Sequence, residues 1–249
     1  LLIPYQKRVV ENLKLAFREE KTEEELKSIA RRMSIYMAKG AVELLYSCSS
    51  AKEKIFERVK IVGKEHLDAA LEKKRGVIAL SSHLGNFTLL GRRLENDSYP
   101  FHTLRKAPKG PLLTRFYRKL ERIYGGRFIY VEPWRECLHR MITCLRNNEI
   151  ICFIPDENKR HGGVKVDFFG QKAPTAIGPA VLSLRTGAPI VPLFIIREMD
   201  DSHTIIIEPE MEVELSGDQD SDVYLITEQF TRIIESYVRR YPDQWQWIS

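Results

Sequence analysis

His83 stands where a buried strand is expected to end and a helix to begin. The preceding run Val77–Leu80 is apolar, a pattern typical of a buried strand. Gly85 and Asn86 then predict a tight turn, with Asn86 capping the helix that follows. Open α/β sheets place their chemistry at the carboxyl ends of strands, so His83 is a candidate catalytic residue. The position suits equally a His that only satisfies a helix amino terminus.

Two other expected strands are also followed by charged residues. Arg105 comes after the expected strand 101–104, where a guanidinium could hold a phosphate with two hydrogen bonds or simply belong to a solvated basic turn. Asp156 and Glu157 come after the run 150–154, which Pro155 closes. Because parallel strands end at one edge of a sheet, these carboxylates are expected near His83.

Cations follow this acidic pair in the same loop. Lys159 and Arg160 lie next to the glycine pair Gly162-Gly163, a combination that could cradle an anionic head group. On their own they would more often form a solvated loop than a site.

The elements that position these residues alternate along the chain. From residue 76 onward, apolar runs of strand length alternate with amphipathic helical stretches, which predicts an α/β fold with a mainly parallel central sheet flanked by helices. Residues 1–75 are expected to be helical, with a capping box at Thr22-Glu-Glu-Glu25 opening a long helix. We expect a single domain over 1–249, with an N-terminal helical part (1–75) and an α/β core (76–249).

Composition narrows the function classes. The net charge of +5 over 249 residues suits a surface that meets anionic lipid or an acidic carrier protein. No dense basic block alternates with aromatic residues, so nucleic-acid binding is not expected. The four cysteines lack Cys-x-x-Cys spacing, and no His pairs with a His or Cys at ligand spacing, so no metal site is expected. Signatures of serine hydrolases and of nucleotide-binding loops are also missing.

An ordered series of motifs resembles one known family. His83-Leu-Gly-Asn-Phe-Thr88 resembles the motif of the late acyltransferases of lipid A biosynthesis, within the lysophospholipid acyltransferase superfamily. The stretch from 150 to 194 resembles the family's Pro-Asp-Gln segment and its Gly-Val-x-Val-x-Phe-Phe-Gly motif, and it includes Arg185 in Leu184-Arg-Thr-Gly187. The residues Tyr241–Trp247 match the family's end, so the resemblance covers about 4–247.

This resemblance implies a glycerolipid acyltransferase-like fold and direct acyl transfer. The donor would be a thioester of acyl-carrier protein or coenzyme A, the acceptor a hydroxyl of a lipid A precursor or related glycolipid, and no cofactor would be needed. His83 would act as the general base, and Asn86, Thr88, Arg105, Lys159, Arg160 and Arg185 would lie near substrate. A lysophospholipid (glycerolipid) acyltransferase and a catalytically silent lipid- or carrier-binding homologue remain alternatives.

One position departs from the family pattern. The family has Glu or Asp where this chain has Thr88, and a carboxylate behind a catalytic His fixes its tautomer. Three outcomes are open: Asp156 or Glu157 supplies the charge, His83 acts unaided at a reduced rate, or the protein binds lipid without turning it over. The first outcome predicts a carboxylate within hydrogen-bond reach of the His83 ring.

The resemblance also implies a location. The family carries a single membrane anchor just upstream of the region matched here, and the printed sequence opens at Leu1-Leu-Ile-Pro without an initiator Met. We expect the protein to work as a membrane-associated enzyme at the cytoplasmic face of the inner membrane, held in part by its basic surface.

Overall fold

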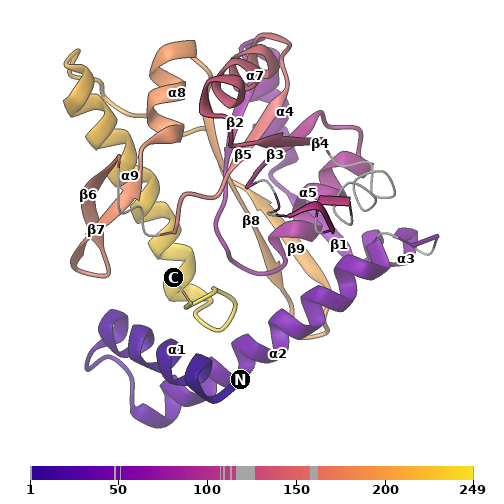
Figure 1. The fold of residues 1–249 in the computed structure, drawn as a ribbon, viewed down its shortest axis with the longest axis vertical. Coiled ribbons are helices and arrows are strands. Elements are labelled where there is room, and N and C mark those ends of the chain that lie inside the picture. Colours follow the sequence, from indigo (N-terminus) through magenta and orange to yellow (C-terminus); the bar gives the residue numbers. More distant parts are fainter. Residues whose placement is uncertain are drawn as a thin grey trace.

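The structure is a computed structural model that describes residues 2–47, 49–50, 52–106, 108, 110–112, 114–115, 127–157 and 162–248. Its centre is a seven-stranded sheet in the order β1-β9-β8-β2-β5-β3-β4, and a separate two-stranded sheet pairs β6 with β7 (Figure 1). The strands are β1 (Val59–Val62), β2 (Val77–Leu80), β3 (Phe101–Arg105), β4 (Arg127–Tyr130), β5 (Ile150–Phe153), β6 (Gly163–Phe168), β7 (Gln171–Ala176), β8 (Ile190–Arg197) and β9 (His203–Ile207).

Helices lie on both faces of the central sheet and below one edge of it (Figure 1). The described helices are α1 (Leu2–Phe17), α2 (Glu23–Ser47), α3 (Lys52–Phe56), α4 (Lys64–Glu72), α5 (Phe87–Asn96), α7 (Trp134–Arg146), α8 (Gly178–Thr186) and α9 (Gln219–Arg240). The helix expected over 111–124 falls mostly outside the described residues.

Strand direction confirms the expected fold class. Strands β8, β2, β5, β3 and β4 run parallel to one another. Strand β9 runs antiparallel to β8, and β1 runs parallel to β9. The sheet is therefore mainly parallel, and the turn between β8 and β9 is the exception that brings the chain back along the edge.

The apolar runs are buried on both sides, as a covered parallel sheet requires. Every residue of β2, β5 and β8 is buried. Along β2 the side chains alternate between two clusters: Ile78 and Leu80 face one, Val77 and Ala79 face the other. Helices α7, α8 and α9 contribute to the first cluster, and α4 and α5 to the second.

Two features of the fold differ from the sequence-based expectation. Residues 51–75 are not wholly helical, because Val59–Val62 forms β1 at the edge of the central sheet, in register with His203–Ile206 of β9. Residues 163–176 form the antiparallel hairpin β6–β7, turned by Phe169 and Gly170, both with positive φ. Alternation of apolar and polar residues in Val164–Phe168 is typical of such a strand.

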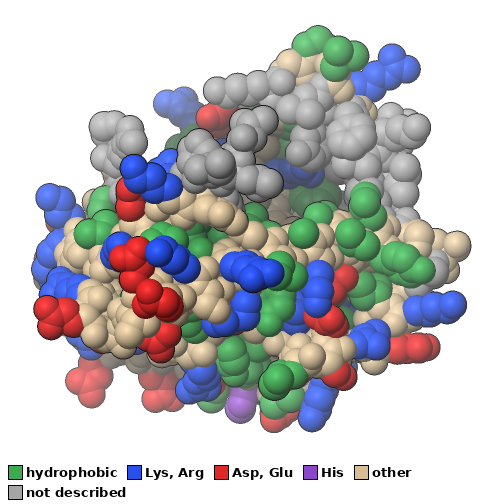
Figure 2. Space-filling view, turned by 90° about the horizontal axis from the view of Figure 1, so that it is seen from below, with side chains coloured by type: hydrophobic (Ala, Val, Ile, Leu, Met, Phe, Trp, Pro, Cys, Tyr) green, Lys and Arg blue, Asp and Glu red, His purple; other side chains and the backbone are tan. Residues whose placement is uncertain are grey.

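The long helix α2 runs below the carboxyl edge of the parallel strands. Its start is the predicted capping box: the Thr22 backbone N–H donates to the Glu25 carboxylate at 2.7 Å, and the Glu25 N–H donates to the Thr22 hydroxyl at 3.3 Å. Farther along, Lys39 pairs with Asp201 of the β8–β9 turn at 2.7 Å. Figure 2 shows the molecule from this side, with apolar side chains lying between Lys and Arg side chains.

None of the described helices combines the length and the apolar character needed to cross a membrane.

Candidate functional site

His83 lies in the loop that leaves the carboxyl end of β2. Backbone contacts fix this loop: the Ser81 N–H donates to the Phe153 carbonyl, and the Gly85 N–H donates to the Gln244 carbonyl at 2.9 Å. Gly85 has φ +58°, and a Cβ there would lie 2.1 Å from the Ile195 carbonyl oxygen. Only glycine fits this close approach to β8, so the turn after His83 is set by sterics.

Asp156 meets His83 directly. One carboxylate oxygen, Oδ1, lies 2.7 Å from His83 Nδ1, and the other, Oδ2, accepts the His83 backbone N–H at 2.7 Å. The register of β2 with β5 explains the meeting, since Leu80 pairs with Phe153 and both chains leave the sheet side by side. The predicted contact between a strand-end carboxylate and the His83 ring is therefore present.

The Asp156 carboxylate is buried, whereas the His83 ring is partly exposed. The Asp156 side chain is 1% exposed and the His83 side chain 22% exposed. An ionised Asp156 accepts hydrogen bonds only, so Nδ1 carries the ring proton and Nε2 is left as the acceptor. A His held in this way, with Nε2 as the ring acceptor, can take a proton from a bound hydroxyl.

Charges around the ring set its proton affinity. Burial alone would lower the pKa of His83, but the hydrogen bond and charge of Asp156, with a smaller contribution from Glu157, raise that pKa above 6.5. Glu157 Oε1 lies 3.9 Å from Nε2, and its half-exposed side chain also pairs with Lys106 at 3.4 Å. Lys106 opposes the rise in the His83 pKa.

The contact between Trp245 and Asp156 was not predicted from the sequence. Its indole N–H donates to Asp156 Oδ2 at 2.7 Å. The neighbouring backbone pairs with the His83 loop, through a bridge between Leu84 and Trp245 and a bond from the Gln246 N–H to the His83 carbonyl. The only signal in the sequence was the resemblance of Tyr241–Trp247 to the family's end. That resemblance does not indicate that Trp245 lies near Asp156.

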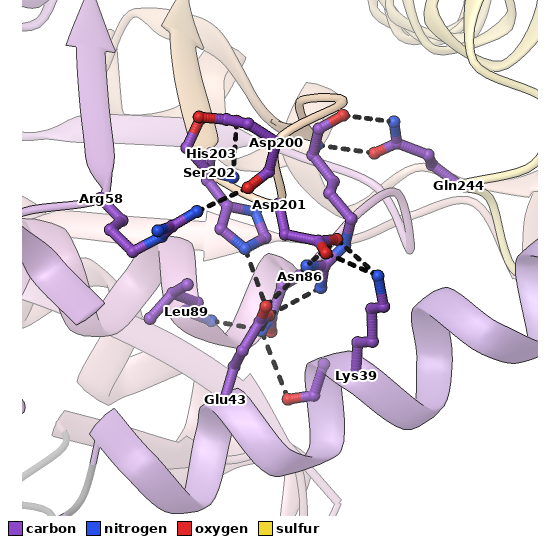
Figure 3. A network of polar contacts seen from close by, with 12 residues as sticks. Lys39, Glu43, Arg58, Asn86, Leu89, Asp200, Asp201, Ser202, His203 and Gln244 are labelled. Atoms are coloured by element: carbon purple, nitrogen blue, oxygen red, sulfur yellow. Dashed lines mark hydrogen bonds and ion pairs between the residues drawn. The ribbon is translucent and has the colours of Figure 1, made fainter. Parts of the chain in front are cut away.

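Asn86 contacts α2, and Thr88 contacts Asn86; none of their described hydrogen bonds goes to the His83 ring. Asn86 caps α5 as predicted, with its Oδ1 accepting the Leu89 N–H at 3.2 Å and the Thr88 hydroxyl at 2.7 Å. Its Nδ2 donates to Glu43 of α2 at 2.9 Å and to the Gly40 carbonyl at 3.3 Å. Figure 3 shows Asn86 with Leu89 and Glu43. The described contacts thus make Asn86 and Thr88 a structural link between α5 and α2.

Glu43 is the centre of this link (Figure 3). Arg197, 3% exposed, donates to both of its oxygens at 2.6 and 2.7 Å, and buried His203 lies 3.2 Å away. Burial works against the charge of Glu43, but its hydrogen bonds to His203, Arg197 and Asn86 outweigh it and lower its pKa to about 2. Gln244 extends the network by bonding both backbone groups of Arg197.

The structure brings some of the other expected site residues to this edge and separates one. Arg105 ends β3 two strands from β2, with its guanidinium 5.2 Å from the Phe128 ring centre. Lys159 and Arg160 lie outside the described residues. Arg185 lies at the opposite end of the parallel strands from His83, so the structure does not bring these two residues together, and a role of Arg185 in substrate binding stays a prediction.

The reason is the direction of α8. Arg185 is in its last turn, just before β8, so it lies at the amino end of the parallel strands. There it lines a cavity of about 380 Å³ with Lys74, Arg75 and Arg146. Arg146 and Arg185 are in the last turns of α7 and α8, where they offset the negative end of the helix dipole.

A second cluster at this amino end combines possible metal ligands. One ligand atom from each of His102, Cys144 and Glu149 lies within 4.8 Å of the others, which the sequence spacing did not suggest. The Glu149 carboxylate already lies 3.0 Å from His102 Nε2 and 3.3 Å from Arg127. Burial lowers the pKa of His102, so among these partners Arg127 supplies the positive charge that pairs with Glu149.

Comparison with known proteins agrees with the motifs. The model of the family described as bacterial lipid A biosynthesis acyltransferase matches residues 4–249. The chain belongs to this family. The resemblance found in the sequence is therefore confirmed.

Individual relatives have two kinds of name. A phosphatidylinositol mannoside acyltransferase of Mycolicibacterium smegmatis is 28% identical over 202 residues, 78% of this chain and 64% of the relative. A lipid A biosynthesis acyltransferase of Haemophilus influenzae is 22% identical over 91% of this chain and 69% of the relative. A lipid A biosynthesis lauroyltransferase of Escherichia coli is 23% identical over 95% and 75%. The chain thus spans less than two thirds of the mycobacterial relative.

Proposed function

We propose that this protein is an O-acyltransferase that moves a fatty acyl chain from a thioester of acyl-carrier protein or coenzyme A to a hydroxyl of a glycolipid. The observation that carries the proposal is the 2.7 Å contact between His83 Nδ1 and Asp156 at the carboxyl edge of the sheet. It gives the chain a carboxylate behind its base although Thr88 replaces the family acid. Of the three outcomes left open by the sequence, it favours the one with a surrogate acid.

In the proposed reaction, His83 Nε2 takes the proton of the acceptor hydroxyl as that oxygen attacks the thioester carbonyl carbon. Asp156 stabilises the imidazolium that forms. The tetrahedral intermediate collapses by breaking the carbon–sulfur bond, and the leaving thiolate takes the proton from His83. General base assistance of this kind contributes roughly 10²–10⁴-fold to the rate.

The acceptor class follows from the relatives. Their names specify lipid A and phosphatidylinositol mannoside, which share a sugar hydroxyl on a membrane lipid. We therefore place a lipid A precursor or a related glycolipid first. A lysophospholipid without a sugar is the second candidate enzyme substrate, and a silent binding protein is the alternative from another class.

The test is an acyl-transfer assay with both donor types and three acceptors: a lipid A precursor, a mannosylated phosphatidylinositol and lysophosphatidic acid. We expect transfer to a sugar-bearing acceptor and its loss in a folded His83→Ala variant. Transfer to lysophosphatidic acid alone would support the second candidate. Binding of acyl thioester or glycolipid without turnover would support the silent homologue, and wild-type turnover by His83→Ala would refute the assigned base.

We further propose that the protein works at a membrane, at the cytoplasmic face of the inner membrane. The support is an apolar stripe on the outer face of α2, with Ile35, Val42, Leu45 and Tyr46 between 45% and 67% exposed. The same helix contributes Gly40 and Glu43, which contact Asn86 of the His83 motif. Insertion of the stripe into a bilayer surface would hold the site beside its lipid acceptor.

Flotation with liposomes tests this surface. We expect the protein to float with anionic vesicles at low salt, and Leu45→Glu combined with Val42→Glu to reduce flotation strongly. Leu215→Glu is the matched control. Leu215 is 56% exposed, but it lies just before the first residue of α9 and outside α2. Equal flotation of all three proteins would exclude the stripe as the contact.

A further inference from the structure

Asp156 is held by more donors than its partnership with His83 needs. Among the described residues it accepts the His83 ring and backbone N–H groups and the Trp245 indole N–H, each at 2.7 Å. The two His83 contacts already fix the carboxylate against the loop. The indole contact therefore does something besides placing it.

Trp245 is itself fixed in a dry environment. It is 5% exposed, its ring lies 4.6 Å from that of Trp247 in an edge arrangement, and Phe168 of β6 contacts it at 5.8 Å. Since Asp156 is also buried, no solvent competes for the bond between the indole and Oδ2, and a low local dielectric strengthens it.

A hydrogen bond to an ionised carboxylate disperses its negative charge. With less charge on Oδ1, the carboxylate holds the imidazolium form of His83 less strongly. We propose that Trp245 is a positioning residue which acts through Asp156: its indole N–H limits how tightly the carboxylate holds the proton of His83, so that the ring stays available as a base. This inference rests on the proposed function of His83.

The other charges facing His83 show why such a limit matters. Asp156 and Glu157 both favour the protonated ring, and Lys106 opposes them. Lys106 is 84% exposed, so salt and water screen its effect. The hydrogen bond from the Trp245 indole N–H to Asp156 also opposes them, and because it is buried, salt and water do not screen it.

The test replaces the N–H while keeping an aromatic ring. Trp245→Phe should move the acidic limb of kcat/KM upward by about half to one pH unit, where one unit corresponds to a ten-fold change in proton affinity. At pH values well above the limb, kcat should return to within about three-fold of wild type. A residue that only supports the fold would lower activity at every pH without moving the limb.

Trp247→Phe is the matched control. Trp247 is equally buried, but its indole N–H donates to the Pro242 carbonyl at 2.6 Å and not to Asp156. We expect it to leave the limb where it is in wild type. If Trp245→Phe does not fold, benzothienylalanine at position 245 removes the N–H from a ring of nearly the same shape.

A second measurement needs no turnover. Titration of the His83 ring by NMR should show a higher pKa in the position-245 variant than in wild type and no change in Trp247→Phe. An unchanged or lowered pKa of His83 would overturn the inference. A raised pKa in a protein without any transferase activity would leave the contact's effect established and refute the proposed function instead.

Discussion

Replacing Asp156 by Asn tests the centre of the proposed site, because the three donors around that carboxylate restrict how an amide can fit. If the amide oxygen takes the place of Oδ2, it accepts the His83 backbone and Trp245 indole N–H groups, and the NH₂ faces His83 Nδ1. If the amide is reversed, its NH₂ faces two buried donors at hydrogen-bond distance. Leaving a buried donor unsatisfied costs about 1–3 kcal/mol, so the first orientation is favoured.

The favoured orientation forces the wrong tautomer on the base. Nδ1 must accept from the amide NH₂, so the ring proton moves to Nε2, which can then no longer take a proton from the acceptor hydroxyl. The equivalent change in serine-protease triads lowers kcat about 10⁴-fold for this reason. For Asp156→Asn we expect a loss in kcat of about 10³–10⁴-fold, at the upper end of general base catalysis.

Two measurements check this prediction. Acyl-transfer kinetics give the loss in kcat, and ¹⁵N shifts of the His83 ring should show an Nδ1–H in wild type and an Nε2–H in the variant. Asp68→Asn, an exposed Asp on α4, controls for a general effect of losing a carboxylate. A folded Asp156→Asn protein that keeps more than about a tenth of wild-type kcat would refute the reasoning.

Other contacts around the site predict three further effects. Thr88→Glu should not raise kcat, because Asp156 already holds the base, and it should lower Tm by adding a carboxylate to the network of Glu43. Glu43→Ala should lower the free energy of unfolding by about 3–5 kcal/mol, because it removes both hydrogen bonds between Glu43 and the buried Arg197 and leaves that cation, among the described carboxylates, only its 3.3 Å contact with Asp201. Because the pKa of His83 is raised above 6.5 and the base must be neutral, kcat/KM should rise with pH along a limb above 6.5.

A control variant and further measurements check these three effects. Glu23→Ala removes an exposed carboxylate from the same helix as Glu43 and should leave Tm unchanged in denaturation scans. The pKa of Glu43, lowered from 4.5 to about 2, sets a second check: its stabilisation should persist above about pH 4.5 and disappear toward pH 2. Glu157→Gln should move the kinetic limb of His83 downward. A gain in kcat from Thr88→Glu would mean that His83 lacks an effective partner.

The contact between His83 and Asp156 could be predicted only in part from local signals. Two short apolar runs, 77–80 and 150–154, each end in polar residues, and parallel strands that are neighbours deliver those residues to one edge. Nothing in the sequence fixed the strand order, which brings β5 beside β2 through long-range contacts. The prediction was correct because the two strands turned out to be adjacent.

Other elements had signals that the prediction did not use. Val164–Phe168 alternates like a strand but drew attention only as a family motif. Arg185 precedes the positive-φ Gly187 and the strand β8, and this order alone places it at the amino edge of a parallel sheet. Edge strand β1 was hidden because Val59-Lys-Ile-Val62 is short and lies among charged residues, where helical propensity and strand propensity differ little.

The missing acid shows why a motif and a mechanism are separable. What the base needs is a carboxylate at Nδ1 and an open Nε2, and that requirement concerns distance and burial rather than position in the sequence. In this chain the Thr88 hydroxyl donates to Asn86, and Asn86 donates to Glu43 of α2, while the neighbouring strand supplies Asp156. An acid at position 88 would therefore join a structural network, so its replacement by Thr removes nothing that the His83 ring contacts.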